Sequence, residues 1–138
     1  CISARENCML RTPIFATLAI AFALAVPAAF AQDAIVRKPL QKSEFPGDLF
    51  ASHLMLITVA PGAVVARHTH PGIEMGYVQE GEATLTIEGK PEIQLKSGDS
   101  YSIPAGAIHA AKNTGTVLVK IIGTFVVDKA KPLATPAP

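Results

Sequence analysis

The chain has 138 residues, a length that predicts a single domain. Its 12 basic and 11 acidic side chains leave a net charge of +1, so the sequence lacks the strongly basic character of a nucleic-acid-binding surface. Apolar residues make up 49% of the composition, and much of that excess lies in the first thirty residues. We therefore expect one domain with its own core, no nucleic-acid partner, and a distinct apolar segment before it.

Residues 9–31 follow the order of a secretory signal peptide. Arg11 supplies a positive start, Ile14–Val26 is an apolar run, Pro27 breaks it, and Ala29-Phe30-Ala31 is a small-x-small ending. The apolar run is shorter than the ~20 residues of a membrane-spanning helix, which disfavours a retained anchor. We expect cleavage near Ala31, a periplasmic or secreted mature protein, and no stable membrane anchor after cleavage.

The eight residues before this segment, residues 1–8, suggest an upstream or misassigned start of translation. They contain both cysteines of the sequence, Cys1 and Cys8. The mature chain is therefore expected to form no disulfide and to offer no thiol as a metal ligand or nucleophile.

Two segments flank the predicted domain. Residues 32–48 are polar and contain Pro39, Pro46 and Gly47, so we expect an irregular N-terminal arm with room for one edge strand. Residues 128–138 are rich in Pro and Ala and lack aromatic residues. Such a composition offers little apolar surface to bury, so we expect a flexible tail.

Residues 49–127 predict an all-β domain. Short runs of Val, Ile, Leu and Thr alternate with Gly and Pro punctuation, which is typical of a sandwich or barrel. In Ala83–Glu88 the apolar residues and the polar residues alternate, so one face of that strand is expected to be buried. The predicted strands are Ala51–Val59, Val64–His68, Glu74–Gln79, Ala83–Glu88, Glu92–Leu95, Ser100–Ile103, Ile108–Lys112 and Val117–Val127.

Three histidines and one glutamate carry the chemistry that the sequence suggests. His68 and His70 are two residues apart, so on a strand their imidazoles point to the same face, with Cα atoms roughly 6.5–7 Å apart. Glu74 follows across the turn Pro71-Gly72, and His109 would lie on a neighbouring strand. Imidazole nitrogens with a carboxylate suit divalent transition metals, and four protein ligands leave positions open for a guest molecule.

The spacing of these residues resembles the two sequence motifs of the cupin superfamily. The first is matched by Gly62, five residues, His68-Thr69-His70, three residues, Glu74, six residues and Gly81. The second is matched by Gly98, five residues, Pro104-Ala105-Gly106, two residues, His109, three residues and Asn113. The short gap between the motifs is similar to that of compact single-domain microbial cupins of the type-2 kind.

This resemblance implies a double-stranded β-helix, the jelly-roll barrel, for residues 49–127. It also implies that His68, His70, Glu74 and His109 bind a divalent metal, such as Fe, Mn, Zn or Ni, inside the barrel. The metal remains open because such a ligand set accepts most first-row divalent ions. The resemblance and the exposed arm also favour a homodimer, since an arm of this kind can add a strand to a partner's sheet edge.

Three classes of function fit these expectations. The first is a metalloenzyme of dioxygenase, isomerase or lyase type acting on a small organic molecule, with Glu74 as a ligand or, if it dissociates, as a catalytic base. The second is a non-catalytic binding or sensing module in which the metal helps to hold a small-molecule ligand. The third is a structural or storage protein. Fold alone does not choose among them.

Other polar and aromatic residues receive weaker expectations. His53 is expected at the edge of the core or on the surface, and Asn113 is expected to close a turn with Gly115. Met75 and Tyr77 share a strand face opposite to Glu74 and should point away from the metal. Tyr101 is expected to be an ordinary core aromatic that reaches the barrel interior.

Overall fold

A computed structural model describes residues 33–47 and 49–138 of the chain. The predicted signal peptide, residues 9–31, and the eight residues before it lie outside the described residues. Among the described residues, no helix has the length and apolarity that crossing a bilayer would require.

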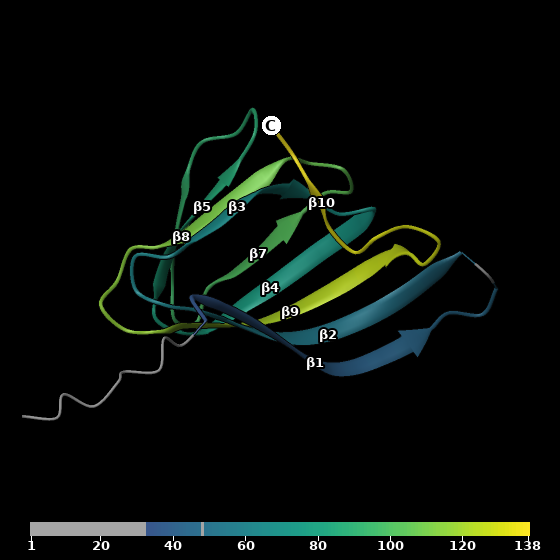
Figure 1. Ribbon diagram of the computed structural model, residues 1–138, viewed down its shortest axis with the longest axis horizontal. Helices are drawn as coiled ribbons and strands as arrows, with labels where there is room; N and C mark the ends of the chain where they lie inside the picture. Colours follow the sequence, from purple (N-terminus) through teal and green to yellow (C-terminus); the bar gives the residue numbers. More distant parts are fainter. Residues whose placement is uncertain (1–32, 48) are drawn as a thin grey trace, which may run out of the picture. The chain divides into compact units, whose positions relative to one another are not determined.

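Ten β-strands form the described part of the chain, and they assemble into two five-stranded sheets (Figure 1). The first sheet has the order β1-β2-β9-β4-β7 and the second has the order β10-β3-β8-β5-β6. The strands are β1 Ile35–Glu44, β2 Phe50–Val59, β3 Val64–Thr69, β4 Gly72–Glu80, β5 Glu82–Ile87, β6 Ile93–Lys96, β7 Ser100–Ile103, β8 His109–Asn113, β9 Val119–Asp128 and β10 Thr135–Pro136.

All the pairings between neighbouring strands are antiparallel. Several consecutive strands lie in different sheets, as with β3 and β4 or β4 and β5, which is the two-sheet arrangement of a jelly roll. The prediction of an all-β jelly roll is therefore confirmed. The eight predicted strands correspond to β2–β9, with bounds that differ by a few residues.

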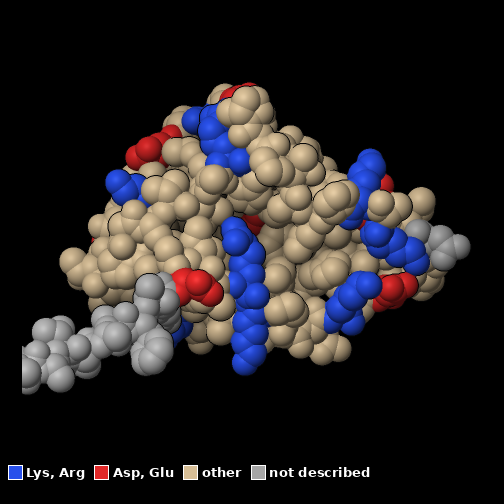
Figure 2. All heavy atoms as spheres, in the orientation of Figure 1, with Lys and Arg blue, Asp and Glu red and all other residues tan. Residues whose placement is uncertain are grey.

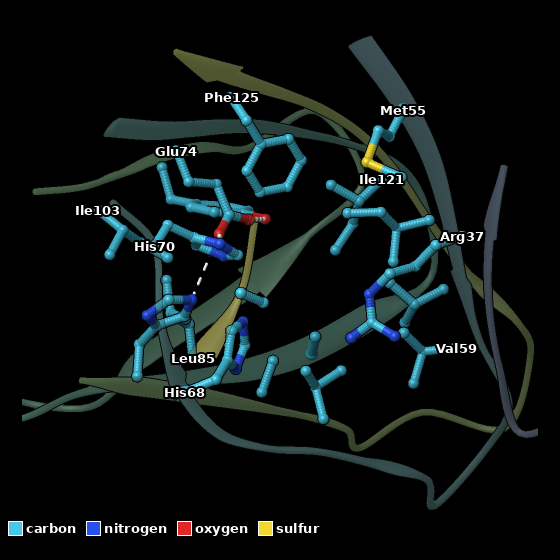
Figure 3. A pocket seen from close by; sticks show the side chains of 18 of the residues that line it. Arg37, Met55, Val59, His68, His70, Glu74, Leu85, Ile103, Ile121 and Phe125 are labelled. Atoms are coloured by element: carbon cyan, nitrogen blue, oxygen red, sulfur yellow. Dashed lines mark hydrogen bonds and ion pairs between the residues drawn. The ribbon is translucent and has the colours of Figure 1, made fainter. Parts of the chain in front are cut away.

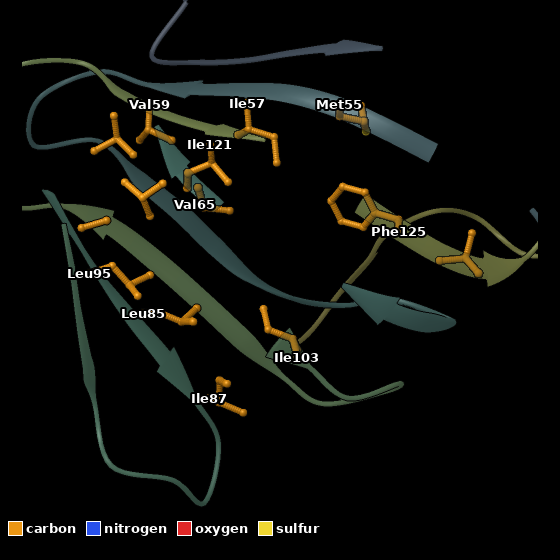
Figure 4. Packing of buried hydrophobic residues seen from close by; sticks show 14 residues of the cluster. Met55, Ile57, Val59, Val65, Leu85, Ile87, Leu95, Ile103, Ile121 and Phe125 are labelled. Atoms are coloured by element: carbon orange, nitrogen blue, oxygen red, sulfur yellow. The ribbon is translucent and has the colours of Figure 1, made fainter. Parts of the chain in front are cut away.

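The core lies between the two sheets, where alternate side chains of each strand point inward (Figure 4). The alternation is clearest in β9, in which Val119, Ile121, Gly123, Phe125 and Val127 are buried and every second residue between them is partly exposed. Leu85 and Ile87 of β5 face them from the other sheet. The period-two pattern that the sequence predicts for Ala83–Glu88 places its apolar side in this core.

Gly81 permits the tight connection between β4 and β5. Its φ is 85°, a conformation that residues with a Cβ rarely adopt. A Cβ there would also approach the backbone carbonyl of Leu118 to 2.8 Å. The glycine of the first motif thus serves the turn that leads from one sheet to the other.

The two flanking segments differ in how far the structure agrees with the sequence. Residues 35–44 of the arm form β1, an edge strand that pairs with β2. The tail, which the sequence predicts to be flexible, instead contains β10, which pairs with the edge of β3 through Thr135 and Pro136. The reason is that the edge of β3 has backbone groups to satisfy, as in the hydrogen bond from the Ala137 amide to the Arg67 carbonyl. Leu133 also packs against the core.

Candidate metal centre

The four residues singled out by their spacing meet between the two sheets. His68 in β3 pairs directly with His109 in β8, and His70 follows the end of β3. Glu74 reaches the same point from β4 of the opposite sheet. One possible ligand atom from each residue lies within 4.8 Å of the others. Figure 3 shows His68, His70 and Glu74 directed toward one another.

Each of the three imidazoles is held by a backbone carbonyl through its Nδ1 atom. The Nδ1 of His68 lies 2.7 Å from the carbonyl oxygen of Ala66, and that of His109 lies 2.9 Å from the oxygen of Ala107. Because a carbonyl oxygen only accepts hydrogen bonds, Nδ1 must carry the proton and donate it. In the neutral ring, Nε2 is then left with a free lone pair.

His70 is oriented in the same way, but its acceptor comes from the tail. Its Nδ1 lies 2.5 Å from the carbonyl oxygen of Leu133. The ring also makes an edge contact with Phe125, with centroids 4.9 Å apart. The tail therefore supplies the group that fixes the tautomer of one of the candidate ligands.

The Nε2 atoms of His70 and His109 point at the carboxylate of Glu74. They lie 3.0 Å and 3.3 Å from its Oε2, and both nitrogens are buried without a hydrogen-bond partner. A neutral Nε2 and an ionised carboxylate oxygen are both acceptors, so this arrangement is repulsive unless a proton or a cation lies between them. A single cation would satisfy all four side chains at once, so the residues present fit a divalent metal.

The carboxylate of Glu74 is buried, with 5% of the residue exposed. Burial by itself raises its pKa, but in the metal-free protein the adjacent imidazoles of His109 and His70, once protonated on Nε2, and the hydrogen bond from Tyr101 outweigh burial and lower the pKa to about 2. The hydrogen bond to Glu74 likewise raises the pKa of His109 against the opposing effect of burial. Burial lowers the pKa of His68, aided by the charges of the other two imidazoles. Glu74 is therefore ionised at neutral pH, as a metal ligand must be.

Tyr101 is a site residue, although the sequence favoured an ordinary core aromatic at this position. Its hydroxyl donates a 2.8 Å hydrogen bond to Oε1 of Glu74, the oxygen not shared with the histidines. Burial and the charge of Glu74 raise the pKa of Tyr101, so it keeps its proton. Tyr101 pairs with Gly76 across β4 and β7, and a Cβ on Gly76 would overlap the tyrosine ring. Gly76, two residues after Glu74 on the same face of β4, was the sequence signal for Tyr101, because a glycine there leaves room for a large neighbouring ring.

The remaining expectations can be compared with the structure residue by residue. Met75 and Tyr77 are about half exposed, on the face away from the cluster, as predicted. His53 is partly exposed in β2. Asn113 accepts a hydrogen bond from the Gly115 amide, as predicted, and it is also buried and donates to the carbonyls of Val59 and Val117.

A cavity of about 90 Å³ adjoins the cluster. Its walls are mainly apolar, and they include Met55, Ile121 and Phe125 (Figure 3). Arg37 of β1 also borders it, which the sequence did not predict. The open side of a metal bound by the four residues would face a small apolar chamber.

The fold and the cluster together define a small double-sheet barrel with a three-histidine, one-carboxylate centre. The family model described as Cupin_2, a cupin domain, matches residues 55–127, and the chain belongs to this family. The matched segment contains the four residues of the cluster.

Two curated proteins and one solved structure illustrate the similarity. A stretch of 66 residues is 41% identical to the HTH-type transcriptional regulator PuuR of Escherichia coli and covers 47% of this chain and 35% of PuuR. A stretch of 77 residues is 39% identical to germin-like protein subfamily 2 member 1 of Arabidopsis thaliana and covers 52% of this chain and 35% of that protein. The chain thus spans about a third of the length of these curated relatives.

The solved structure is a conserved protein with a double-stranded β-helix domain from Klebsiella pneumoniae. It superimposes with a TM-score of 0.62, covering 80% of this chain and 90% of that chain. The sequences are 22% identical, so this likeness shows the fold alone.

Proposed function

We propose that this protein is a metal-dependent enzyme that acts on a small organic molecule, with His68, His70, Glu74 and His109 as the metal ligands. The observation that carries the proposal is the convergence of buried Nε2 lone pairs on the Glu74 carboxylate next to an apolar cavity. Iron, manganese, zinc and nickel all suit such a ligand set. The reaction would be of dioxygenase, isomerase or lyase type.

A bound divalent ion would supply Lewis acidity, or redox capacity in the case of iron. The protein residues would prepare the site for it. The carbonyls of Ala66, Ala107 and Leu133 hold the imidazole protons on Nδ1 and so present Nε2 to the ion. Tyr101 holds the second oxygen of Glu74, and the apolar walls of the cavity exclude water from the bound substrate.

Glu74 has a role as ligand and a proposed role as catalytic base. With a pKa of about 2 beside the protonated imidazoles and Tyr101 in the metal-free protein, it is a weak base. Release of Glu74 from these partners would raise its pKa, because burial would then dominate. A catalytic role for Glu74 as a base therefore requires its dissociation from the histidines during the reaction.

The test compares the metal content of the parent with that of His68→Ala/His109→Ala. Purified parent protein should contain about one divalent ion per chain by elemental analysis, and the double variant should lose it while keeping a β-rich circular dichroism spectrum. His53→Ala is the matched control, because it removes an imidazole outside the cluster. Equal metal content in the parent and the double variant would refute the assignment.

The second candidate function is non-catalytic binding or sensing of a small molecule. It is supported by the similarity of the cupin segment to part of a protein named as a transcriptional regulator rather than as an enzyme. A ligand that raises the unfolding temperature of the metal-loaded protein, without any turnover, would favour this function over catalysis.

Export and self-association belong to the same proposal. We propose that the mature protein begins at Gln32 and acts in the periplasm or outside the cell, which N-terminal sequencing of exported protein tests.

We also propose a homodimer without a nucleic-acid partner. Exposed apolar side chains on the outer face of β4, Ile73, Met75 and Tyr77, support an interface there. A monomeric mass by light scattering would contradict the dimer.

A further inference from the structure

The register between β1 and β2 explains why Arg37 borders the cavity. In β1 it pairs with Ile57 of β2, whose side chain is buried in the barrel. Paired residues of antiparallel strands point to the same face, so Arg37 is directed inward while Val36 and Lys38 point outward. Figure 3 shows the guanidinium of Arg37 on the opposite side of the cavity from His68 and His70.

The guanidinium of Arg37 has no hydrogen-bond or ion-pair partner among the described residues. Arg67, the other arginine in that part of the chain, is fully engaged: it pairs with Glu88 and donates to the Pro138 carbonyl. Glu74 is the carboxylate among the residues that line the cavity; its Oε1 accepts from Tyr101, and its Oε2 faces Nε2 of His70 and His109 rather than Arg37. Arg37 is solvent-exposed on the edge strand β1, borders the apolar cavity and has no partner, so its guanidinium is available to a ligand anion there.

Lys112 also borders the cavity, but it does not compete for this role. By the two-residue period of β8, Lys112 points to the opposite face from buried His109 and Asn113, and it also lines a groove on the outer face of its sheet with Thr84 and Thr86. In the orientation of Figure 1, a column of basic atoms crosses the middle of the visible face (Figure 2). Among the described residues, the cation whose strand position aims it into the cavity is Arg37.

We infer that Arg37 binds the carboxylate of the ligand, and that the ligand is a small organic carboxylate. This inference rests on the proposed function and names its substrate class. The planar guanidinium matches a carboxylate with two parallel hydrogen bonds. A cavity of about 90 Å³ admits a molecule of only a few heavy atoms. Its apolar walls suit a short hydrocarbon body between the carboxylate and the His/Glu cluster, and they disfavour a strongly hydrated anion such as phosphate.

The experiment measures butyrate binding to the metal-free and metal-loaded full chain by NMR titration, with butyramide as the uncharged probe. Three variants are compared: Arg37→Gln removes the charge, Arg37→Lys keeps the charge without the two-pronged geometry, and Lys38→Gln is the matched control on the outward face of the same strand. Arg37→Gln should weaken butyrate binding at least tenfold and Arg37→Lys by less. The affinity of Lys38→Gln for butyrate should stay within twofold of that of the parent. The parent should bind butyramide no more tightly than Arg37→Gln binds butyrate.

The outcomes separate this inference from the proposed function. Equal effects of Arg37→Gln and Lys38→Gln, or equal binding of butyrate and butyramide by the parent, would overturn the role of Arg37 even if the parent holds metal. Butyrate binding that disappears in the metal-free parent would also overturn it, because the carboxylate would then bind at the metal. A parent without metal would refute the proposed function, while an intact Arg37 effect in that protein would still support the carboxylate site.

Discussion

At the scale of single residues, the site depends on where protons are held. Carbonyl oxygens fix the Nδ1 protons of His68, His70 and His109, so each ring presents Nε2 toward the cluster. Tyr101 donates to Glu74 and keeps the carboxylate ionised. A metal that replaces the missing partners of the Nε2 atoms would remove the repulsion between those nitrogens and Glu74.

Tyr101→Phe tests the hydrogen bond to Glu74 through the pH dependence of stability. In the metal-free parent the pKa of Glu74 falls from 4.5 to about 2 on folding, so its contribution is present above pH 4.5 and is lost as the pH falls toward 2. At pH 7 the variant should be less stable by about 2 kcal/mol, the typical worth of a hydrogen bond to a charged group. That difference should shrink between pH 4.5 and 2 in urea unfolding.

The comparison isolates Glu74 because both proteins share the other titrating groups. The pKa of His68 is lowered on folding, so its contribution to the stability of the protein is lost as the pH falls below 6.5. The pKa of His109 is raised on folding, so its contribution is lost as the pH rises above 6.5. Both effects are common to the parent and the variant. Tyr77→Phe, which removes an exposed hydroxyl from β4, should change stability little at any pH. A gap between the parent and Tyr101→Phe that stays constant from pH 7 to 2 would contradict the assignment.

At the scale of elements, β10 connects the tail to the site. It pairs with β3 beside His68, and this pairing keeps the Leu133 carbonyl at Nδ1 of His70. The strand contributes only two paired residues at the edge of its sheet, so the barrel does not depend on it. The tail is therefore expected to affect the metal site more than the fold.

Truncation of the chain after Lys131 should lower metal affinity about tenfold, the lower end of the range for loss of a group that orients a ligand. His70 would lose the acceptor that fixes its tautomer, while the circular dichroism spectrum should remain that of the parent. Affinity is measured by competition with a chelator of known strength.

Leu133→Ala is the matched control for the truncation. It removes the side chain that packs on the core but keeps the backbone carbonyl that accepts from His70. We expect it to bind metal more tightly than the truncated chain. Equal affinities of the truncated chain and the parent would show that the carbonyl has no part in metal binding.

At the scale of the whole molecule, the core and the metal centre are separate sources of stability. Fourteen buried apolar residues form one cluster between the sheets, and none of them is a candidate metal ligand. Such a core supports folding through burial of apolar surface alone. The metal would then add to the stability of a protein that is already folded.

Removal of metal with a chelator should leave a folded protein with a lower unfolding temperature. Metal at 1,000 times its dissociation constant stabilises the native state by about 4 kcal/mol. For a domain of this size, that difference corresponds to a rise of about 15 °C or more in unfolding temperature. Thermal unfolding followed by circular dichroism measures the shift.

The double variant His68→Ala/His109→Ala serves as the control for this shift, since added metal should leave its unfolding temperature unchanged. Unfolding of the parent by the chelator would contradict the independence of the core. That result would instead favour the structural role for the metal that the sequence left open.

The sequence by itself determined the strands β2–β9, the family and the four residues of the cluster. Period-two alternation decides which side of a strand is buried, and it predicts β2–β9 because each short run carries its own pattern. The spacing of His68, His70, Glu74 and His109 is visible because those residue types are rare and stand between fixed glycines and prolines. These are local properties of the chain.

Only the tertiary structure decided what surrounds the cluster. Tyr101, Arg37 and the Leu133 carbonyl reach the site from β7, β1 and the tail, and no spacing in the sequence relates them to the histidines. Their positions depend on cross-strand register, such as the pairing of Tyr101 with Gly76 and of Arg37 with Ile57. The tail was predicted to be flexible because it is rich in Pro and Ala and lacks aromatic residues, but an open strand edge elsewhere in the fold pairs with it through Thr135 and Pro136.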